Sequence, residues 1–226
     1  LAGIIFFRKS LLTLSASCLL ASIVMLVAHM SFVNPQITNL VPVLKSYWLS
    51  IHVSVITASY GFLGLSCLLG LLALVLMALK NSANRERLNA QIRYITAINE
   101  ISLIVGLSML TLGNFFGGVW ANESWGRYWG WDSKETWSYV SIIVYAIVLH
   151  LKLIPKLGSI YVYCVSSTLA YSSIIMTYFG VNFYLTGMHS YAAGDAPQIP
   201  APFYCIIAAI FLIIALAFRG RDVKTI

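Results

Sequence analysis

Long apolar runs separated by short polar stretches dominate this chain. Each run is close to the ~20 residues that a helix needs to cross the hydrocarbon core of a bilayer. The runs cover residues about 11–32, 50–79, 94–112, 135–151, 158–179 and 202–218. The pattern therefore predicts an all-α fold, a polytopic transmembrane helix bundle with six spanning helices.

Composition supports the membrane assignment. The chain is 60% hydrophobic and only 9% charged, and its mean hydropathy is +0.86, whereas soluble domains carry about 25% charged residues. The net charge of +7 does not indicate nucleic acid, because the cations form short clusters between the apolar runs. The expected surroundings are a lipid bilayer.

The distribution of Lys and Arg predicts how the helices cross the membrane. Of the fourteen cations, eleven fall at the two chain ends and in the second and fourth connections, while Lys45, Arg127 and Lys134 fall in the other connections. Cytoplasmic segments are enriched in such cations. We expect both termini in the cytoplasm and external loops at about 33–49, 113–134 and 180–201. Residues 1–226 are interpreted as a single transmembrane domain.

The first residues look like the end of an earlier element. The chain starts at Leu1 without Met, and the apolar residues 1–7 are too few to span a bilayer. The basic pair Arg8 and Lys9 follows these residues, whereas a signal peptide has its basic residues first. We therefore expect a fragment of a larger or fused protein.

Tryptophan is confined to the predicted external side. An ordinary aromatic belt places Trp at both interfaces, yet Trp48 lies in the first external loop and the other five lie in W-A-N-E-S-W-G-R-Y-W-G-W-D-S-K-E-T-W. These five are Trp120, Trp125, Trp129, Trp131 and Trp137. Indoles offer a broad, polarizable apolar face, which suits a flat guest such as a porphyrin.

The charged residues of this motif allow more than one interpretation. Asp132 and Glu135 form D-x-x-E before an apolar run, which is a capping box that opens a helix, and we favour this over a direct ligand role for Asp132. Arg127 and Lys134 are either interfacial charges or partners of heme propionates, since Arg forks bind carboxylates well.

Four histidines complete the candidate chemistry. His52 and His189 lie at the external side, one before and one after the Trp-rich motif. Neutral imidazole is a common axial ligand of heme iron, although two hydrogen-bonded interfacial histidines would fit their positions equally well. For His29 we expect a structural role near the external face. Glu100 should find a polar partner, either His150 or a neighbouring basic residue.

The segment W-G-R-Y-W-G-W-D-S-K-E-T-W resembles the WWD signature of heme-handling membrane proteins. Within that group the chain is most similar to the CcsA family, the membrane component of the system II cytochrome c synthetase. The segments H-V-S-V-I-T-A-S-Y, V-L-H-L and G-V-N-F-Y-L-T-G-M-H-S-Y-A match in the same order, so the resemblance extends from about His52 to Phe218.

The resemblance implies a site residue by residue. His52 and His189 would ligate the iron of an external heme, and His150 would ligate an inner heme whose second ligand comes from outside this chain. The residues expected around the external heme are Trp120, Trp125, Trp129, Trp131, Asp132 and Arg127. No residue of this chain is expected to act as a catalytic acid, base or nucleophile.

The resemblance also implies a function in cytochrome c biogenesis. Such proteins bind and export heme b with reduced iron, and they present it to the CXXCH motif of an apocytochrome c together with a CcsB-like partner or a fused upstream segment. The chain has no CXXCH of its own, so it is not itself a cytochrome c. The expected location is the bacterial inner membrane, with the WWD loop facing the periplasm, and the expected enzyme activity is a share in a holocytochrome c synthase.

Two other functions fit the same residues. A heme delivery or transport protein would use this site without attaching heme. A membrane cytochrome b electron carrier would use bis-His hemes, although such proteins place paired histidines within facing helices, whereas His52 and His189 are expected at the aqueous edge.

Overall fold

Every regular element is helical in the residues that the computed structural model describes, which are 11–29, 45–188 and 198–223. The α-helices are α2 (Leu11–Ala28), α3 (Tyr47–Ala78), α4 (Arg85–Trp125), α5 (Ser133–His150), α6 (Ile160–Ile175), α7 (Val181–Tyr184) and α8 (Ala201–Ala217). Shorter turns are η2 (Leu151–Leu153), the π-helical turn η3 (Met176–Gly180) and η4 (Phe218–Gly220). The predicted all-α class is confirmed.

Five stretches are long and apolar enough to cross a membrane: Tyr47–Ala78, Arg85–Trp125, Ser133–Leu153, Ile160–Tyr184 and Ala201–Gly220. Helix α2 is a shorter apolar helix, and the last part of the predicted run 11–32 lies outside the described residues. The chain is therefore a multi-pass membrane protein with five such spans and a shorter sixth apolar helix in its described part.

Helix α4 corrects one expected boundary. The apolar run predicted a span over 94–112, but the helix has 41 residues, from Arg85 to Trp125. At 1.5 Å per residue it measures about 60 Å, roughly twice the hydrocarbon core. Its polar first turns and its glycine-containing last turns stay helical, so Trp120 and Trp125 lie on a helix and not in a loop.

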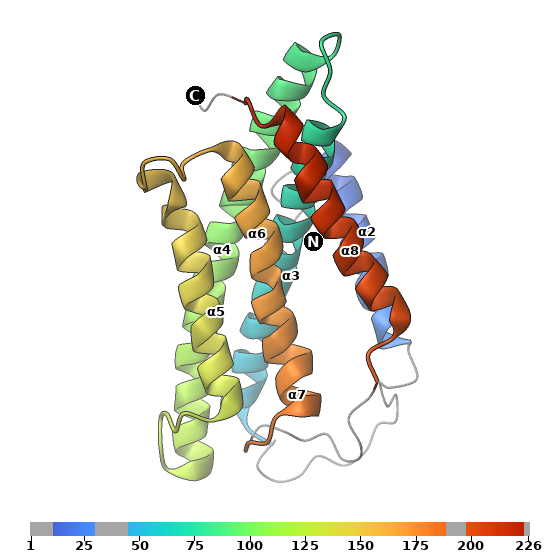
Figure 1. Ribbon diagram of the computed structural model, residues 1–226. Helices are drawn as coiled ribbons and strands as arrows, with labels where there is room; N and C mark the ends of the chain where they lie inside the picture. The colour runs from blue at the N-terminus through green and yellow to red at the C-terminus, as the bar shows by residue number, and fades with distance from the viewer. Residues whose placement is uncertain (1–10, 30–44, 189–197, 224–226) are drawn as a thin grey trace.

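Helix α3 occupies the centre of the bundle. It packs against α4 and α6 on one side and against α2 and α8 on the other (Figure 1). Small residues permit the close approach to α4: a Cβ added at Gly106 would lie 2.7 Å from Leu63 Cδ2, and one at Gly113 would lie 2.6 Å from Ile56 Cδ1. Small residues at helix contacts are typical of membrane bundles.

A buried polar network joins three of these helices. Ser66 Oγ of α3 donates to Asn99 Oδ1 of α4 at 2.6 Å, and Asn99 Nδ2 donates to Ser167 Oγ of α6 at 3.0 Å. All three residues are completely buried. Since a buried amide needs partners, this network specifies how α3, α4 and α6 meet.

Three of the four ion pairs among the described residues lie at one end of the bundle. Lys80 and Arg85, beside the turn between α3 and α4, both pair with Asp222 near the described C-terminal end. The hydrogen bond from Lys80, with the charges of Lys80 and Arg85, holds the pKa of the Asp222 carboxyl below its usual range. At the same end Lys152 pairs with Glu100. Glu100 therefore has a neighbouring basic residue as its partner, one of the two expected alternatives, and not His150.

Candidate functional site

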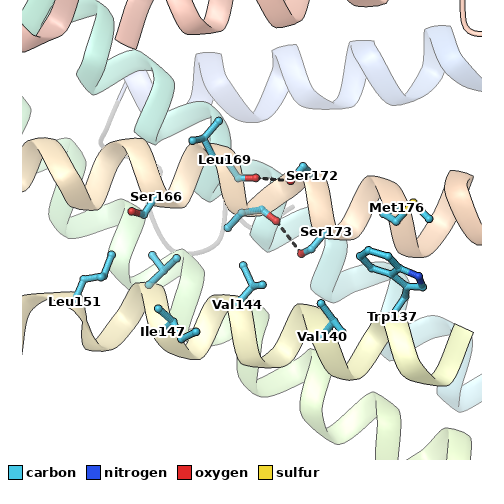
Figure 2. Close-up of a pocket in the computed structure, with 12 residues that line it drawn as sticks. Trp137, Val140, Val144, Ile147, Leu151, Ser166, Leu169, Ser172, Ser173 and Met176 are labelled. Atoms are coloured by element: carbon cyan, nitrogen blue, oxygen red, sulfur yellow. Dashed lines mark hydrogen bonds between the residues drawn. The ribbon is translucent and has the colours of Figure 1, made fainter. Parts of the chain in front are cut away.

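A groove between two helices is lined by no ionisable group. It is an open groove of about 610 Å³ between α5 and α6, running from Trp137 to Leu151 (Figure 2). Two of its hydroxyl groups are satisfied locally, since Ser172 and Ser173 donate to the carbonyl oxygens of Leu169 and Ala170 on their own helix. The groove therefore offers an apolar surface without reactive side chains.

A smaller cavity, of about 270 Å³, is lined by ionisable and aromatic side chains. It lies at the end of the bundle opposite the three ion pairs, between the first turns of α3, the last turns of α4, the start of α5 and the π-helical turn η3. Its wall includes His52, Trp120, Trp129, Lys134 and Tyr178. An imidazole, an ammonium group and several aromatic rings thus face one space, which is typical of a ligand site.

His52 is held against α4 by two glycines. Its Nδ1 donates to the carbonyl oxygen of Gly113 at 2.7 Å, and a Cβ added at Gly117 would lie 2.7 Å from His52 Cε1. The ring lies parallel to Trp120, with an interplanar angle of 8° and centroids 6.4 Å apart. Because a carbonyl can only accept, Nδ1 carries the proton and the neutral ring has its lone pair on Nε2.

The tryptophans meet edge to face and do not form a flat stack. Trp120 and Trp125 have centroids 4.8 Å apart at 63°, and Trp129 and Trp131 are 5.6 Å apart at 89°. Edge-to-face pairs are a favourable arrangement of aromatic rings. We call these four residues the indole wall; their ring faces point in different directions, and only Trp120 and Trp129 line the cavity.

The connection between α4 and α5 is short and strained. Helix α4 ends with Gly126 in the left-handed conformation at φ 69°, which favours glycine, but Trp131 is also left-handed, at φ 59°. A residue with a side chain adopts this conformation at a cost of about 1–2 kcal/mol. Trp131 is nevertheless 69% exposed, so the strain holds a large apolar ring outward, and such strain is often found at functional sites.

Trp129 has an unusual polar atom. Its indole Nε1 is buried and has no hydrogen-bond partner among the described residues, although Trp129 lines the smaller cavity. A buried donor without an acceptor costs about 1–3 kcal/mol. A ligand with an acceptor oxygen at this point would remove that cost.

Glu135 stabilises the connection between α4 and α5 by accepting three hydrogen bonds. It accepts hydrogen bonds from Arg127 Nη1 at 3.3 Å, Gly130 N at 2.7 Å and Asp132 N at 3.2 Å. The Asp132 side chain accepts from Lys134 N, and both halves of the capping box are present, which confirms that expectation. Arg127, for which propionate binding was one of two interpretations, therefore has a carboxylate partner within the protein. Its Cζ also lies 5.6 Å from the ring centroid of Trp125.

The structure brings together some of the expected site residues and separates others. His52, Trp120 and Trp129 line one cavity, with Trp125 against Trp120 and Trp131 on the outer surface. His150 lies at the other end of the bundle, exposed, and its Nδ1 donates to Ala146 O of its own helix. His189 lies outside the described residues.

His29 is exposed, and its Nδ1 donates to Met25 O on its own helix. This local bond agrees with the expected structural role.

Several residues that line the smaller cavity were not predicted from the sequence. Tyr60, Asn114 and Thr177 line the smaller cavity beside His52, and the π-helical turn η3 turns Thr177 and Tyr178 towards it. One signal was available: Gly113 and Gly117 have the G-x-x-x-G spacing of close helix contacts in membranes, which marks the surface against which His52 lies.

These features define a multi-pass membrane protein with a cavity lined by histidine and tryptophan at one end of its bundle. Residues 1–189 match the sequence profile of the family described as cytochrome C assembly protein. The chain belongs to this family.

Individual relatives agree with the family assignment. The chain is 57% identical over 195 residues to protein NrfI of Wolinella succinogenes, covering 86% of this chain and 22% of that protein. It is 35% identical over 191 residues to the cytochrome c biogenesis protein CcsA of Prochlorococcus marinus, covering 73% and 62%. For CcsA of Chlamydomonas reinhardtii the identity is 37% over 156 residues, covering 69% and 44%. The chain spans less than two thirds of each relative.

Proposed function

We propose that this chain binds heme b, with its iron reduced, at the His52 cavity and presents it to the CXXCH motif of an apocytochrome c. The observation that carries the proposal is the geometry of His52. Its Nδ1 donates to Gly113 O, so the lone pair of the neutral ring is on Nε2, the atom that would ligate iron. A hydrogen bond at the other ring nitrogen orients an axial histidine and raises its basicity.

The wall of the cavity suits a porphyrin edge. Trp120 and Trp129 supply apolar surface, while the Lys134 ammonium group and the Trp129 Nε1–H can both bind a propionate carboxylate. The enclosed volume of about 270 Å³ is below the range of cavities that bury a whole drug-sized ligand. The cavity would therefore hold only the part of the macrocycle around His52 and leave one edge accessible to a protein substrate.

The remaining ligands are proposed on the family resemblance. His189, which follows Met188 directly in the sequence, is the proposed second axial ligand of the external heme. His150 is the proposed ligand of an inner heme, with its partner in another chain or in a fused upstream segment, such as a CcsB-like protein. The proposed orientation places the His52 cavity in the periplasm and both termini in the cytoplasm of a bacterial inner membrane.

The attachment chemistry asks little acid–base work of this chain. Each CXXCH thiol adds across one vinyl group: a C–S bond forms, the thiol proton goes to the other vinyl carbon, and no oxidant is consumed. The contribution of the protein is orientation, because holding reactants together replaces a bimolecular encounter. His52 and the indole wall would fix the heme plane while the thiols approach its open edge.

Replacing His52 tests this proposal. In the full-length protein with its partner, His52→Gly should lose most bound heme and most holocytochrome formation, and added imidazole should restore part of both. His29→Gly is the control, because His29 is an exposed histidine whose ring bonds to its own helix and lies outside the cavity. Wild-type heme content and attachment in His52→Gly would refute the proposal. Retained heme without covalent attachment in the wild type would favour a delivery protein.

A further inference from the structure

Three consecutive residues at the start of α5 bind the segment that follows η3. Met188 N donates to Asp132 Oδ1, Ser133 Oγ donates to Thr186 O, and Lys134 Nζ donates to Asn182 Oδ1, each at 2.7 Å. We call Asp132, Ser133 and Lys134, with these three bonds, the polar latch. It joins two segments about 50 residues apart in the sequence.

The capping box orients the Asp132 carboxylate so that one of its oxygens faces Met188 N. Its Oδ2 accepts from Lys134 N at 3.3 Å, while its Oδ1 accepts from Met188 N. Glu135 holds the Asp132 backbone N–H from the other side. The two carboxylate oxygens therefore have different partners: Oδ2 caps α5, and Oδ1 binds the segment that contains Met188.

The latch holds one residue of α7 and the irregular residues that follow this helix. Helix α7 ends at Tyr184, and residues 185–188 are irregular. The position of an irregular segment depends on bonds to its neighbours, because its backbone groups still require partners. A further contact comes from Arg127, whose Nη2 lies 2.8 Å from Met188 Sδ.

The latch also touches the cavity. Lys134 lines it and lies 6.0 Å from the centroid of Tyr178, another wall residue. One side chain thus contacts both the proposed heme site and the third external segment. A shift of that segment would be transmitted to the cavity wall through Lys134.

We propose that Asp132, Ser133 and Lys134 are positioning residues that set the distance between the His52 cavity and the chain that leads from Met188 into the next residue, His189. This rests on the proposed function, in which His52 and that segment supply the two ligands of one iron. Such outer partners typically change affinity by about 10–100-fold when they are lost.

The variants Ser133→Ala and Asp132→Asn test the latch in the full-length protein, with hemin as the probe. Asn caps helices as well as Asp does, but its single oxygen cannot serve both Lys134 N and Met188 N. Both variants should keep His52 ligation, convert iron from the six-coordinate low-spin to the five-coordinate high-spin spectrum, and recover the low-spin spectrum when imidazole is added. Ser172→Ala, which removes only a bond within α6, should behave as wild type.

A cross-link tests the geometry without heme. Cysteines placed at positions 133 and 186, in a background with Cys18 and Cys205 replaced by Ala, should form a disulfide on oxidation, and either cysteine alone should not. Failure to cross-link would overturn the latch. If His52→Gly changed the hemin spectrum but both latch variants kept wild-type spectra, the positioning role would be wrong and the proposed function would stand. An unchanged spectrum in His52→Gly would overturn both.

Discussion

At the scale of single residues, the position of the His52 imidazole depends on two glycines of the neighbouring helix. Gly117 leaves room for the ring of His52, and Gly113 exposes the carbonyl oxygen that fixes its tautomer. The position and the tautomer of His52 therefore depend on the backbone of the neighbouring helix.

The substitution Gly117→Ala should displace this ring. The new Cβ would lie 2.7 Å from His52 Cε1, which is too close, so the ring must turn and its bond to Gly113 O must weaken. We expect hemin affinity to fall by about tenfold, as for other losses of a partner that orients a metal ligand. Quenching of tryptophan fluorescence by hemin measures it.

The matched control is Gly61→Ala, also on a helix but with open space around its added Cβ. This variant should keep wild-type affinity. Equal losses in the two variants would mean that helix perturbation, and not the position of His52, weakens binding.

The sequence was sufficient for some of these residues and not for others. The segment H-V-S-V-I-T-A-S-Y drew attention to His52, and the WWD signature to the Trp-rich segment. The pattern D-x-x-E predicted the capping box of Asp132 correctly, because a cap depends on residues close in sequence. The bond between His52 and Gly113 spans 61 positions, so it follows from how two helices cross. The buried Nε1 of Trp129 likewise depends on three-dimensional packing that no local pattern encodes.

At the scale of elements, the apolar runs predicted where helices exist but not where they end. Hydropathy falls at the polar start of α4 and at its glycines, yet the helix continues from Arg85 to Trp125 because packing against α3 supports it. The π-helical turn η3 was also missed, since an i→i+5 turn leaves no periodic signature in so few residues. Tertiary contacts decide both features.

The network of Ser66, Asn99 and Ser167 should stabilise the packing of α3, α4 and α6. Asn99→Ala removes two interhelical hydrogen bonds, which in membranes contribute about 0.6 kcal/mol each, so the free energy of unfolding should fall by about 1 kcal/mol. Reversible unfolding in mixed micelles measures the loss.

The control for this prediction is Ser54→Ala. Ser54 Oγ donates only within α3, to Ser50 O at 2.7 Å, so its loss should leave helix packing unchanged. A free energy of unfolding for Asn99→Ala equal to that of the wild type would show that the buried network contributes nothing to stability.

At the scale of the whole molecule, the two ends of the bundle differ in chemistry. One end carries ion pairs around Lys80 and Lys152, and the opposite end carries Trp48 and the cavity. Basic residues favour the cytoplasmic side. The described structure thus separates the two sets of residues as the charge pattern predicts, and the direction in the membrane is open to measurement.

Single cysteines should report that direction. Lys45→Cys and Asn81→Cys introduce exposed thiols just before and just after the long helix α3, and so at opposite ends of the bundle. In intact spheroplasts, a membrane-impermeant thiol reagent should label the first at once and the second only after lysis, with the unmodified protein as the background for Cys18 and Cys205. The reverse order would invert the proposed orientation.

Helix α4 is about twice as long as the hydrocarbon core is thick. Its excess length must extend beyond the core or be taken up by tilt. In the function proposed above, the indoles on its last turns would lie at the membrane surface, so that a water-soluble polypeptide would dock there without entering the lipid.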